Sequence, residues 1–405
     1  MTQLLENIKV VEVAIYGFVP SAAAALSDWG AAVVKVEHPE TGDPVHGLSA
    51  YGVNPGDGGV TALWEVFNRG KRSVGINIGT PEGLELLMQM IDEADVFLTN
   101  FMGSARRRLG IDVDAVMARN PRIIYGRGTG HGPVGPDAEK GGFDAVSYWS
   151  RPGASIAAIS PGGDWPVMMP SPAFGDLQAG LHLAGGIVAA LYQREKTGAG
   201  SVVDVSLLGS GLWAMQGSIA GCYAKSSSCL EQLDRLRPPN PMANIYRTKD
   251  RQYFVLGMLE SDKYWEQFCA AFGRQDLAKD PQFIDSRQRA KNNAACVSAL
   301  DSIFEQMTLA QVREILNTQE GQWAVIAAPG DSVHDQQALD NNYIQFVDYP
   351  NGARLPLVPL PTRLNGEDIK LRPAPAHAEH TDEVLSAIGK TPDELIELKI
   401  AGVIS

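Results

Sequence analysis

Strand-like and helix-like hydrophobic patterns alternate along the first part of the chain. The valine-rich runs 8–14 and 31–37 are typical of buried strands, and the alanine-rich segment 21–30 between them favours a helix. Such βαβ units form parallel sheets that bind ligands at the carboxyl ends of their strands. We therefore expect an α/β fold with a doubly wound sheet. The pattern continues with predicted helices from Thr80 and at 112–120, and with predicted strands at 95–99 and 122–126.

The longest helical pattern starts beside Asp176. Apolar side chains recur at spacings of three and four from Leu177 to Leu191, and a turn at 197–200 precedes a strand-like run at 202–208. An aspartate at a helix start commonly caps the first backbone N–H groups, and this stretch alone favours that role. The functional alternative is a nucleophile, because the positive end of the helix dipole keeps a carboxylate ionised.

The second half of the chain predicts a separate unit. The helical and polar segment 209–229 is interpreted as a linker helix. Residues 230–328 combine a hairpin around a Lys249–Asp250 turn with amphipathic helices, so we expect a small domain there. The last segment, 329–405, contains an extended run with prolines and ends in one short helix.

The composition excludes several classes of partner. The chain has 405 residues, of which 44% are hydrophobic and 20% charged, as in a globular protein with two domains. Its 47 acidic and 34 basic residues give a formal net charge of -13, which disfavours nucleic acid or a membrane as partner. We expect a cytoplasmic protein, because no secretory signal is evident and no stretch is apolar over a membrane span of about 18 residues. Four cysteines form no C-x-x-C pair and are expected to be reduced: Cys222, Cys229, Cys269 and Cys296.

Several common sites are disfavoured as well. The first predicted βα turn holds Gly17 alone and lacks the G-x-G-x-x-G of dinucleotide-binding folds. The glycine-rich stretch 126–136 follows a strand, but Pro133 and Pro136 occupy the positions where a phosphate-binding helix would begin. We expect a loop there. The histidines show no metal-ligand spacing, so we expect no metal site.

Three consecutive arginines, Arg106 to Arg108, form the densest cationic cluster. Neighbouring charges of this kind most often lie on a solvated helix face. The functional alternative is a clamp for phosphate groups, since the donor fork of a guanidinium matches phosphate oxygens. Lys71 and Arg72 have the same two interpretations.

Many segments, taken in order along the chain, form a recognisable series, although none is decisive alone. They are VVEVAIYGFVPSAAAALSDWGAAVVKVEHPETGD, NRGKRSVGINIGTPEG, ADVFLTNFMGSARRRLG, GFDAVSYWSRPG, GDLQAG, LYQREKTGAGSVVDVSLL, NPMANIYRTKDRQYFVLGM, EHTDEVL and AGVI. With these segments, nearly the whole chain resembles the family III CoA-transferases, which include formyl-CoA, carnitine and bile-acid CoA-transferases.

The resemblance implies a more specific fold. Residues 1–208 would form the N-terminal part of a Rossmann-like large domain, and 329–405 would return to complete it. The parallel sheet would then be formed by both chain ends, with a smaller α+β domain inserted between them. Two chains would be threaded through one another as an interlocked homodimer.

The resemblance also implies a nucleophile and a CoA site. The nucleophilic aspartate of the family falls on Asp176, and coenzyme A or acyl-CoA is a substrate, with no prosthetic group. The positions that contact CoA fall on Ile15, Tyr16, Gly17, Phe18, His38, Ile76, Asn77, Ile78, Asn100, Phe101, Arg108, Leu109 and, in the motif at 142–144, Phe143.

The implied reaction moves CoA from an acyl-CoA donor to a carboxylic acid, through aspartyl anhydride and aspartyl-CoA thioester intermediates. Formyl-CoA transferases carry a histidine and a glutamine where this chain has Ile15 and Gly17, which disfavours small acids such as formate or oxalate. GFDAVSYWSRPG and GDLQAG resemble the branch acting on (R)-phenyllactate and 2-hydroxyisocaproate. We therefore expect an aromatic or branched 2-hydroxy acid, with Phe18, Tyr148 and Trp149 as apolar lining.

Two alternative functions remain open. An α-methylacyl-CoA racemase would use the histidine of a G-H-D motif together with the aspartate. The motif here is Gly142-Phe143-Asp144, and phenylalanine cannot carry a proton. The other alternative is a catalytically silent acyl-CoA-binding protein on the same fold.

Overall fold

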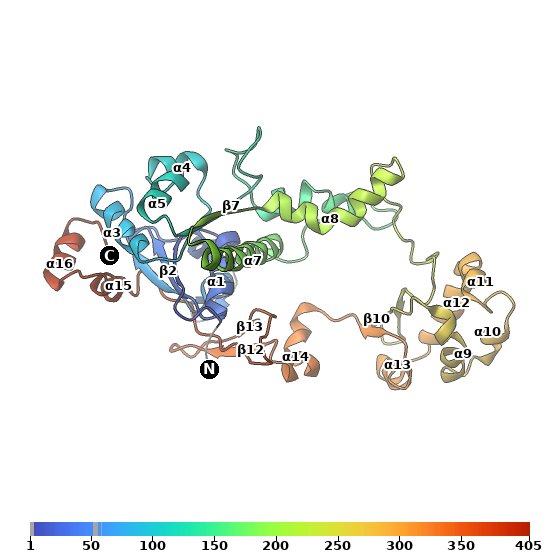
Figure 1. The fold of residues 1–405 in the computed structure, drawn as a ribbon. Coiled ribbons are helices and arrows are strands. Elements are labelled where there is room, and N and C mark those ends of the chain that lie inside the picture. The colour runs from blue at the N-terminus through green and yellow to red at the C-terminus, as the bar shows by residue number, and fades with distance from the viewer. Residues whose placement is uncertain (1–3, 52–55, 58) are drawn as a thin grey trace. The chain divides into compact units, whose positions relative to one another are not determined.

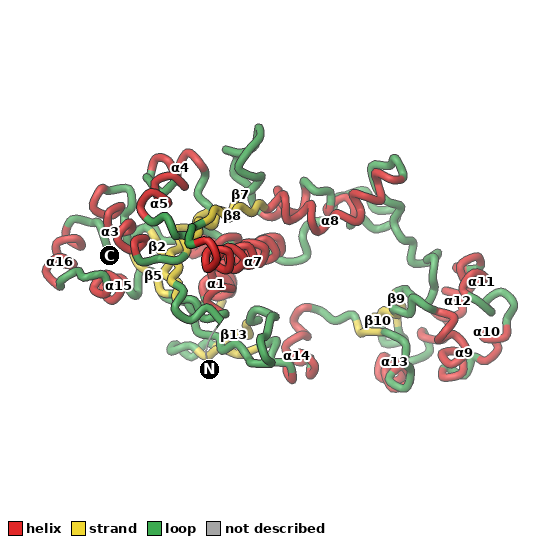
Figure 2. Tube along the Cα trace, viewed as in Figure 1, coloured by secondary structure: helices red, strands yellow, loops and turns green. Residues whose placement is uncertain are grey.

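The computed structural model describes residues 4–51, 56–57 and 59–405 (Figure 1). Its contacts divide the chain into two compact units. The first unit contains Met1–Ala158, Trp165–Leu230 and Gln336–Ser405, and the second contains Ile159–Asp164 and Glu231–Asp335. Helices outweigh strands in both units (Figure 2).

The first unit is built on a six-stranded sheet in the order β5-β2-β1-β6-β7-β8. All neighbouring strands are parallel, as the βαβ pattern predicts. The α/β class and the parallel sheet are therefore confirmed. The strands are β1 (Lys9–Val13), β2 (Ala32–Glu37), β5 (Arg72–Gly75), β6 (Val96–Thr99), β7 (Ile124–Thr129) and β8 (Ser201–Ser206). The glycine-rich stretch predicted as a loop thus begins inside β7 and becomes a loop only after Thr129.

The prediction that both chain ends build this sheet is wrong. All six strands lie within residues 9–206. The C-terminal segment adds no strand to this sheet and meets its β5 edge through an isolated antiparallel bridge between Ile76 and Ile404 and through hydrogen bonds to the backbone of Ser73 and Gly75. The strands β12 (Gln345–Asp348) and β13 (Arg354–Leu357) pair with each other instead. Pro356, Pro359 and Pro361 lack amide donors, which makes this run unsuited to an interior strand.

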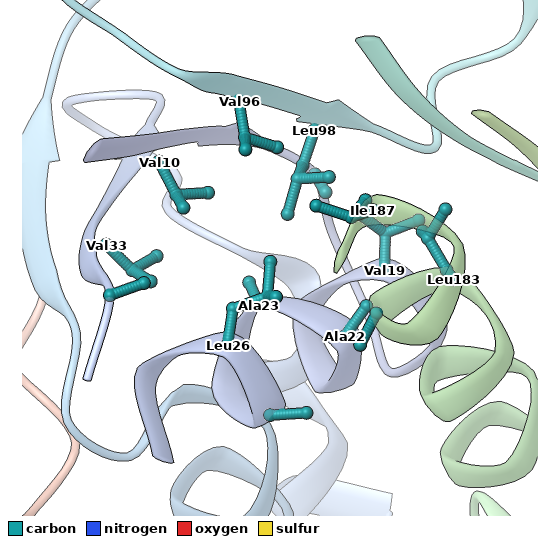
Figure 3. Close-up of a cluster of buried hydrophobic side chains, with 14 of the residues drawn as sticks. Val10, Val19, Ala22, Ala23, Leu26, Val33, Val96, Leu98, Leu183 and Ile187 are labelled. Atoms are coloured by element: carbon teal, nitrogen blue, oxygen red, sulfur yellow. The ribbon is translucent and has the colours of Figure 1, made fainter. Parts of the chain in front are cut away.

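Two helices cover one face of the sheet and pack against each other. They are α1 (Phe18–Asp28) and α7 (Phe174–Thr197), and Figure 3 shows Leu183 and Ile187 of α7 beside α1 and the strands. A side chain at Gly180 would lie 2.0 Å from Ser21 Oγ and 3.0 Å from the carbonyl oxygen of Phe18. This close approach brings the start of α7 beside the first βα turn.

By length and composition, α7 is apolar enough to cross a membrane, so the expectation that no stretch has this property is wrong. Within the folded unit 44% of its apolar window is buried. Its inward face contributes Ala179, Leu183, Ala184 and Ile187 to the core, which is the ordinary use of an apolar helix in a packed domain.

Helices on the other face of the sheet form a second core. They are α3 (Pro81–Asp92), α5 (Val113–Arg119), α15 (Thr381–Ala387) and α16 (Pro392–Ile400). Thr80 caps α3 as the sequence predicts, with its hydroxyl accepting from the N–H of Gly83 at 3.0 Å. The remaining elements of the first unit are η1 (Pro44–Tyr51), β3 (Gly56–Asp57), β4 (Val60–Thr61), α2 (Ala62–Asn68), α4 (Gly103–Arg108), η2 (Ala145–Ser150), α6 (Ala154–Ala157), α8 (Leu207–Ala224) and α14 (Gln336–Asp340).

The second unit combines a small antiparallel sheet with helices around its own core. The predicted hairpin is present, because β9 (Ile245–Arg247) pairs with β10 (Tyr253–Leu256) around a turn that contains Lys249 and Asp250. The other elements are β11 (Trp323–Val325), α9 (Ser261–Ala271), α10 (Gln275–Lys279), α11 (Ser286–Lys291), α12 (Asn293–Phe304), α13 (Leu309–Leu316) and η3 (Pro329–His334).

A fully buried charge network joins the strands of the first unit. Glu12 on β1 accepts from Lys35 Nζ at 3.0 Å and from Lys71 Nζ at 2.6 Å. Lys35 also pairs with Asp43 at 2.9 Å, and Asp43 in turn accepts the backbone N–H of Tyr16 at 3.0 Å. The network therefore holds the first βα turn in place, where Tyr16 has a left-handed φ of 62°.

The pKa values of the two lysines show how this network is balanced. Burial acts to lower the pKa of Lys35, but Asp43, Glu12 and Glu37 together raise it above its usual value. Burial lowers the pKa of Lys71 to about 8 despite the attraction of Glu12. Lys71 is thus a buried structural residue, and both the solvated-face and the phosphate-clamp interpretations of Lys71 are wrong. Arg72 pairs with Glu383 at 3.1 Å.

We predict that Glu12→Gln lowers the free energy of unfolding by about 3–5 kcal/mol, because it leaves two buried lysines short of their counter-charge. Urea unfolding of the full chain measures the change. The matched control is Glu93→Gln, which breaks an exposed pair with Lys9 and should cost less than about 1 kcal/mol. Equal losses from the two substitutions would contradict the structural role of the network.

Candidate active site

A cavity of about 180 Å³ opens at the carboxyl ends of the parallel strands. Its walls come from segments that follow three different strands. Residues 16–18 follow β1, 100–103 follow β6, and 128–130 end β7. The lining is completed by the loop at 138–143, Asp176 of α7, Arg106, Arg107, Arg127, Pro133 and Leu207. Ligand sites of doubly wound sheets lie at this edge, so the cavity is the candidate active site.

Asp176 is the third residue of α7, and its half-buried carboxyl group faces the first βα turn. A side chain at Gly17 would come within 2.4 Å of Asp176 Oδ2 and 2.9 Å of Phe67 Cζ. The hydroxyl of Ser21 donates to the backbone carbonyl of Asp176 at 3.2 Å. The helix begins at Phe174 after Ala173, and no side chain of its own caps it. The capping interpretation of Asp176 is therefore wrong.

The protonation of Asp176 also differs from the sequence-based expectation. Burial, and secondly the charge of Asp144, raise the pKa of Asp176 to about 8. The dipole of α7 does not outweigh these two effects. The free carboxyl group is therefore largely protonated near neutral pH, whereas an ionised group was expected.

The residue that the sequence analysis missed is Asp144. It is 8% exposed, its Oδ1 accepts the N–H of Ala145 at 2.8 Å, and its Cβ lies 2.8 Å from the position that a side chain on Gly175 would occupy. Burial raises its pKa, and the N–H groups of Ala145, Gly175 and Asp176 oppose this change. The motif at 142–144 contains this aspartate and could have indicated it. The motif was used only to show that Phe143 cannot carry a proton.

The three arginines of α4 have three different environments. Arg106 is buried and donates to the carbonyl oxygen of Phe101 at 2.5 Å, and burial lowers its pKa. Arg106 forms no ion pair within the described part of the chain. Arg107 pairs with Glu139 at 3.2 Å, and Arg108 is exposed. Arg106 and Arg107 line the cavity, and Arg108 does not. The three arginines therefore form neither a solvated helix face nor a single phosphate clamp.

The predicted CoA-contacting residues separate into two groups. Tyr16, Gly17, Phe18, Asn100, Phe101 and Phe143 line the cavity with Asp176. The ring of Phe143 meets Tyr16 edge to face at 5.2 Å. The residues that do not line it are Ile15, His38, Ile76, Asn77, Ile78, Arg108 and Leu109.

Members of the second group mostly have structural contacts. The backbone of Ile15 and the side-chain amide of Asn100 form two hydrogen bonds, at 3.0 Å and 2.6 Å. Ile15 thus holds Asn100, which lines the cavity. Ile76 is buried in the second core, where Ile78 and Leu109 also pack. The backbone N–H of Asn77 donates to Val403 at 2.8 Å, and the carbonyl of His38 contacts the His377 ring at 3.0 Å.

Tyr148 and Trp149, expected to line the substrate site, pack instead against Phe174 at the start of α7. Tyr148 belongs to the core, because it is 6% exposed, and Trp149 packs against that core. Among the described residues, no group of three histidine, cysteine, aspartate or glutamate side chains could hold a metal ion.

Comparison with known proteins gives the family. The model of CoA-transferase family III matches residues 5–381, so the chain belongs to this family and is a CoA-transferase. It is 30% identical to a (R)-2-hydroxy-4-methylpentanoate CoA-transferase of Clostridioides difficile, with 99% of each chain covered. It is also 30% identical to a cinnamoyl-CoA:phenyllactate CoA-transferase of Clostridium sporogenes, over 98% of this chain and 96% of that one. A CAIB/BAIF family protein from Brucella suis has a similar structure, with a TM-score of 0.83 and 26% identity over 96% of this chain and 100% of that chain.

The pH dependence of stability tests the environment of Asp176. The folded chain holds this proton up to about pH 8, whereas the unfolded chain releases it near its ordinary pKa of 3.8. The contribution of Asp176 to stability therefore falls as pH rises between these values, by about 1.4 kcal/mol per unit of pKa difference. We predict that Asp176→Asn gains stability over the wild type between about pH 5 and about pH 8 in urea unfolding. A difference that stays constant over this range would show that the carboxyl group has an ordinary pKa.

Proposed function

We propose that Asp176 is the nucleophile that carries the acyl group and then CoA during transfer. The observation that supports this role is the position of its carboxyl group in the cavity that Arg106 and Arg107 also line. A carboxylate can attack a thioester, and two guanidinium groups suit the phosphates of CoA.

The proposed reaction keeps the energy of the thioester. After the carboxyl group of Asp176 has lost its proton to solvent, one of its oxygens bonds to the acyl carbon, the carbon–sulfur bond breaks, and CoA leaves as a thiolate. The thiolate attacks the aspartyl carbonyl and releases the donor acid, which leaves an aspartyl-CoA thioester. The incoming acid displaces CoA through a second anhydride, and the thiolate then attacks the new acyl carbon. Each step is easier than direct exchange between the two substrates.

The cavity walls suit a weakly polar acid beside this nucleophile. Tyr16, Phe18, Phe101 and Phe143 give an aromatic lining, and Gly17 leaves space against Asp176. The two relatives described above are named for 2-hydroxy-4-methylpentanoate and for phenyllactate. We therefore propose an aromatic or branched 2-hydroxy acid as the acceptor.

We predict that the purified chain transfers CoA to phenyllactate or 2-hydroxy-4-methylpentanoate, and that Asp176→Ala loses about 10⁴-fold or more of this activity. Chromatography of the acyl-CoA esters measures transfer, and hydroxylamine traps the acylated enzyme. The matched control is Asp114→Ala, an exposed carboxylate in the first turn of α5 that should leave transfer unchanged.

The same assay separates the alternatives. A silent acyl-CoA-binding protein would give no transfer and no hydroxylamine-sensitive adduct with any donor. A racemase would exchange the α-proton of a 2-methylacyl-CoA in deuterated water. We expect no such exchange, because Phe143 occupies the position where a proton carrier is needed.

We also propose that the chain acts as a homodimer, with a second copy covering α8. Among the 18 residues of α8, the buried ones are Leu207, Ser210 and Gly211. The apolar side chains of Trp213, Ile219 and Tyr223 are 65%, 43% and 89% exposed. A helix with so little cover and so much exposed apolar surface is typical of a subunit interface.

We predict that light scattering coupled to size exclusion gives the mass of two chains. The substitution Trp213→Glu should shift this mass toward one chain, because it places a charge in an apolar contact. The control is Ile396→Glu on α16, an apolar side chain that is 55% exposed away from α8. A monomeric wild type, or equal shifts for both variants, would contradict this interface.

A further inference from the structure

A second buried carboxyl group, that of Asp144, lies against the helix turn that carries Asp176. Its Oδ2 is buried and has no hydrogen-bond partner among the described residues, and its Oδ1 accepts only the neighbouring Ala145 N–H. No lysine or arginine neutralises it in the described part of the chain. Buried carboxylates without a cation are costly, so this arrangement requires an explanation.

Asp144 packs against the first turn of α7, which no side chain of its own caps. Ala173, the residue before the helix, has a left-handed φ of 58° and no side chain that can accept a hydrogen bond. The N–H groups of Gly175 and Asp176 face the Asp144 carboxyl group and oppose the rise in its pKa. Any side chain at Gly175 would collide with Asp144 and Tyr148, so the two segments are in direct contact. Asp144 therefore fixes the turn from which Asp176 projects.

The cations that line the cavity do not form ion pairs with Asp144 or Asp176. The other charged groups of the cavity are Arg106 and Arg107 of α4, Arg127 of β7, and Glu139 and Lys140 of the following loop. Arg107 pairs with Glu139, Arg127 pairs with Asp204, and Lys140 pairs with Asp137. Arg106 donates to the carbonyl oxygen of Phe101. Among the described residues, Asp144 is the charged group that raises the pKa of Asp176, after burial. When Asp176 is ionised, no ion pair in the part of the chain that the structure describes offsets the repulsion between the two carboxylates.

We propose that Asp144 is the positioning residue of the nucleophile, which fixes the first turn of α7 and faces Asp176 with a buried negative charge that favours acylation. This inference rests on the proposed function of Asp176. When Asp176 attacks the thioester, its oxygen bonds to the acyl carbon and the electron pair of the broken bond leaves on the CoA sulfur. The aspartyl group becomes neutral and the repulsion by Asp144 disappears, while Asp144 itself gains and loses no bond. Repulsion also makes the free Asp176 carboxylate more basic, and a more basic carboxylate is the better nucleophile.

The test is the pH profile of kcat/KM for Asp144→Asn, which keeps a carbonyl acceptor and loses the charge. Without repulsion Asp176 ionises more readily, so the acid limb should move to lower pH by about one unit. The plateau should fall by roughly threefold to tenfold, because the nucleophile is less basic. Asp144→Glu keeps the charge and should restore the wild-type limb. The control Asp112→Asn alters another helix cap, whose carboxylate accepts the Ala115 N–H at 3.0 Å, and should not move the limb.

A limb that stays in place in Asp144→Asn, with only a lower rate, would reduce Asp144 to a structural cap and overturn the inference. A second measurement needs no turnover: the infrared absorption of the protonated Asp176 carboxyl, assigned as the band that Asp176→Asn lacks, is titrated in both backgrounds. Its midpoint should fall by about one unit in Asp144→Asn, and an unchanged midpoint would also overturn the inference. An inactive wild type with the shifted midpoint would instead refute the proposed function and leave the coupling intact.

Discussion

The buried contacts of Glu12 with Lys35 and Lys71 are the constraint on which the site depends. They join β1, β2 and the start of β5, and through Asp43 they hold the backbone of Tyr16. The first βα turn thereby takes a conformation that a tyrosine seldom adopts alone. Asp176 lies against this turn, so a charge network without access to solvent determines one wall around the nucleophile.

The second constraint is the close packing of α1 and α7. Gly180 admits the hydroxyl of Ser21 at a distance that no larger residue would allow, and the same hydroxyl contacts the backbone of Asp176. The two helices and the first βα turn thus pack around Asp176, and Asp144 packs against the neighbouring Gly175. Burial is the largest reason for its raised pKa, and the neighbouring carboxylate is the second. These surroundings disfavour the negative charge of the Asp176 carboxylate, and acylation of Asp176 removes this charge.

Local patterns predicted the elements well, and they predicted the contacts between distant segments poorly. The strand and helix periodicities of the first 130 residues, the Thr80 cap and the hairpin around Lys249–Asp250 follow from short-range rules. The burial of Lys71 could not be predicted, because its partner Glu12 is distant in sequence and nothing local distinguishes it from a surface lysine. The same holds for Asp144, whose importance arises from contact with Gly175. The separate fates of Arg106, Arg107 and Arg108 depend on which side of α4 meets the cavity.

The covalent role of Asp176 has one direct test. The acceptor acid is labelled with heavy oxygen in its carboxyl group, and the chain is digested after a single turnover so that the mass of the peptide containing Asp176 can be measured. If the acid passes through an anhydride with Asp176, one of its oxygen atoms remains on this side chain after the new acyl-CoA leaves. The peptide should therefore gain one heavy oxygen, located at Asp176 by fragmentation. Formation of labelled acyl-CoA with no label in this peptide would mean that CoA passes between the substrates without a covalent aspartyl intermediate, and the account would be wrong.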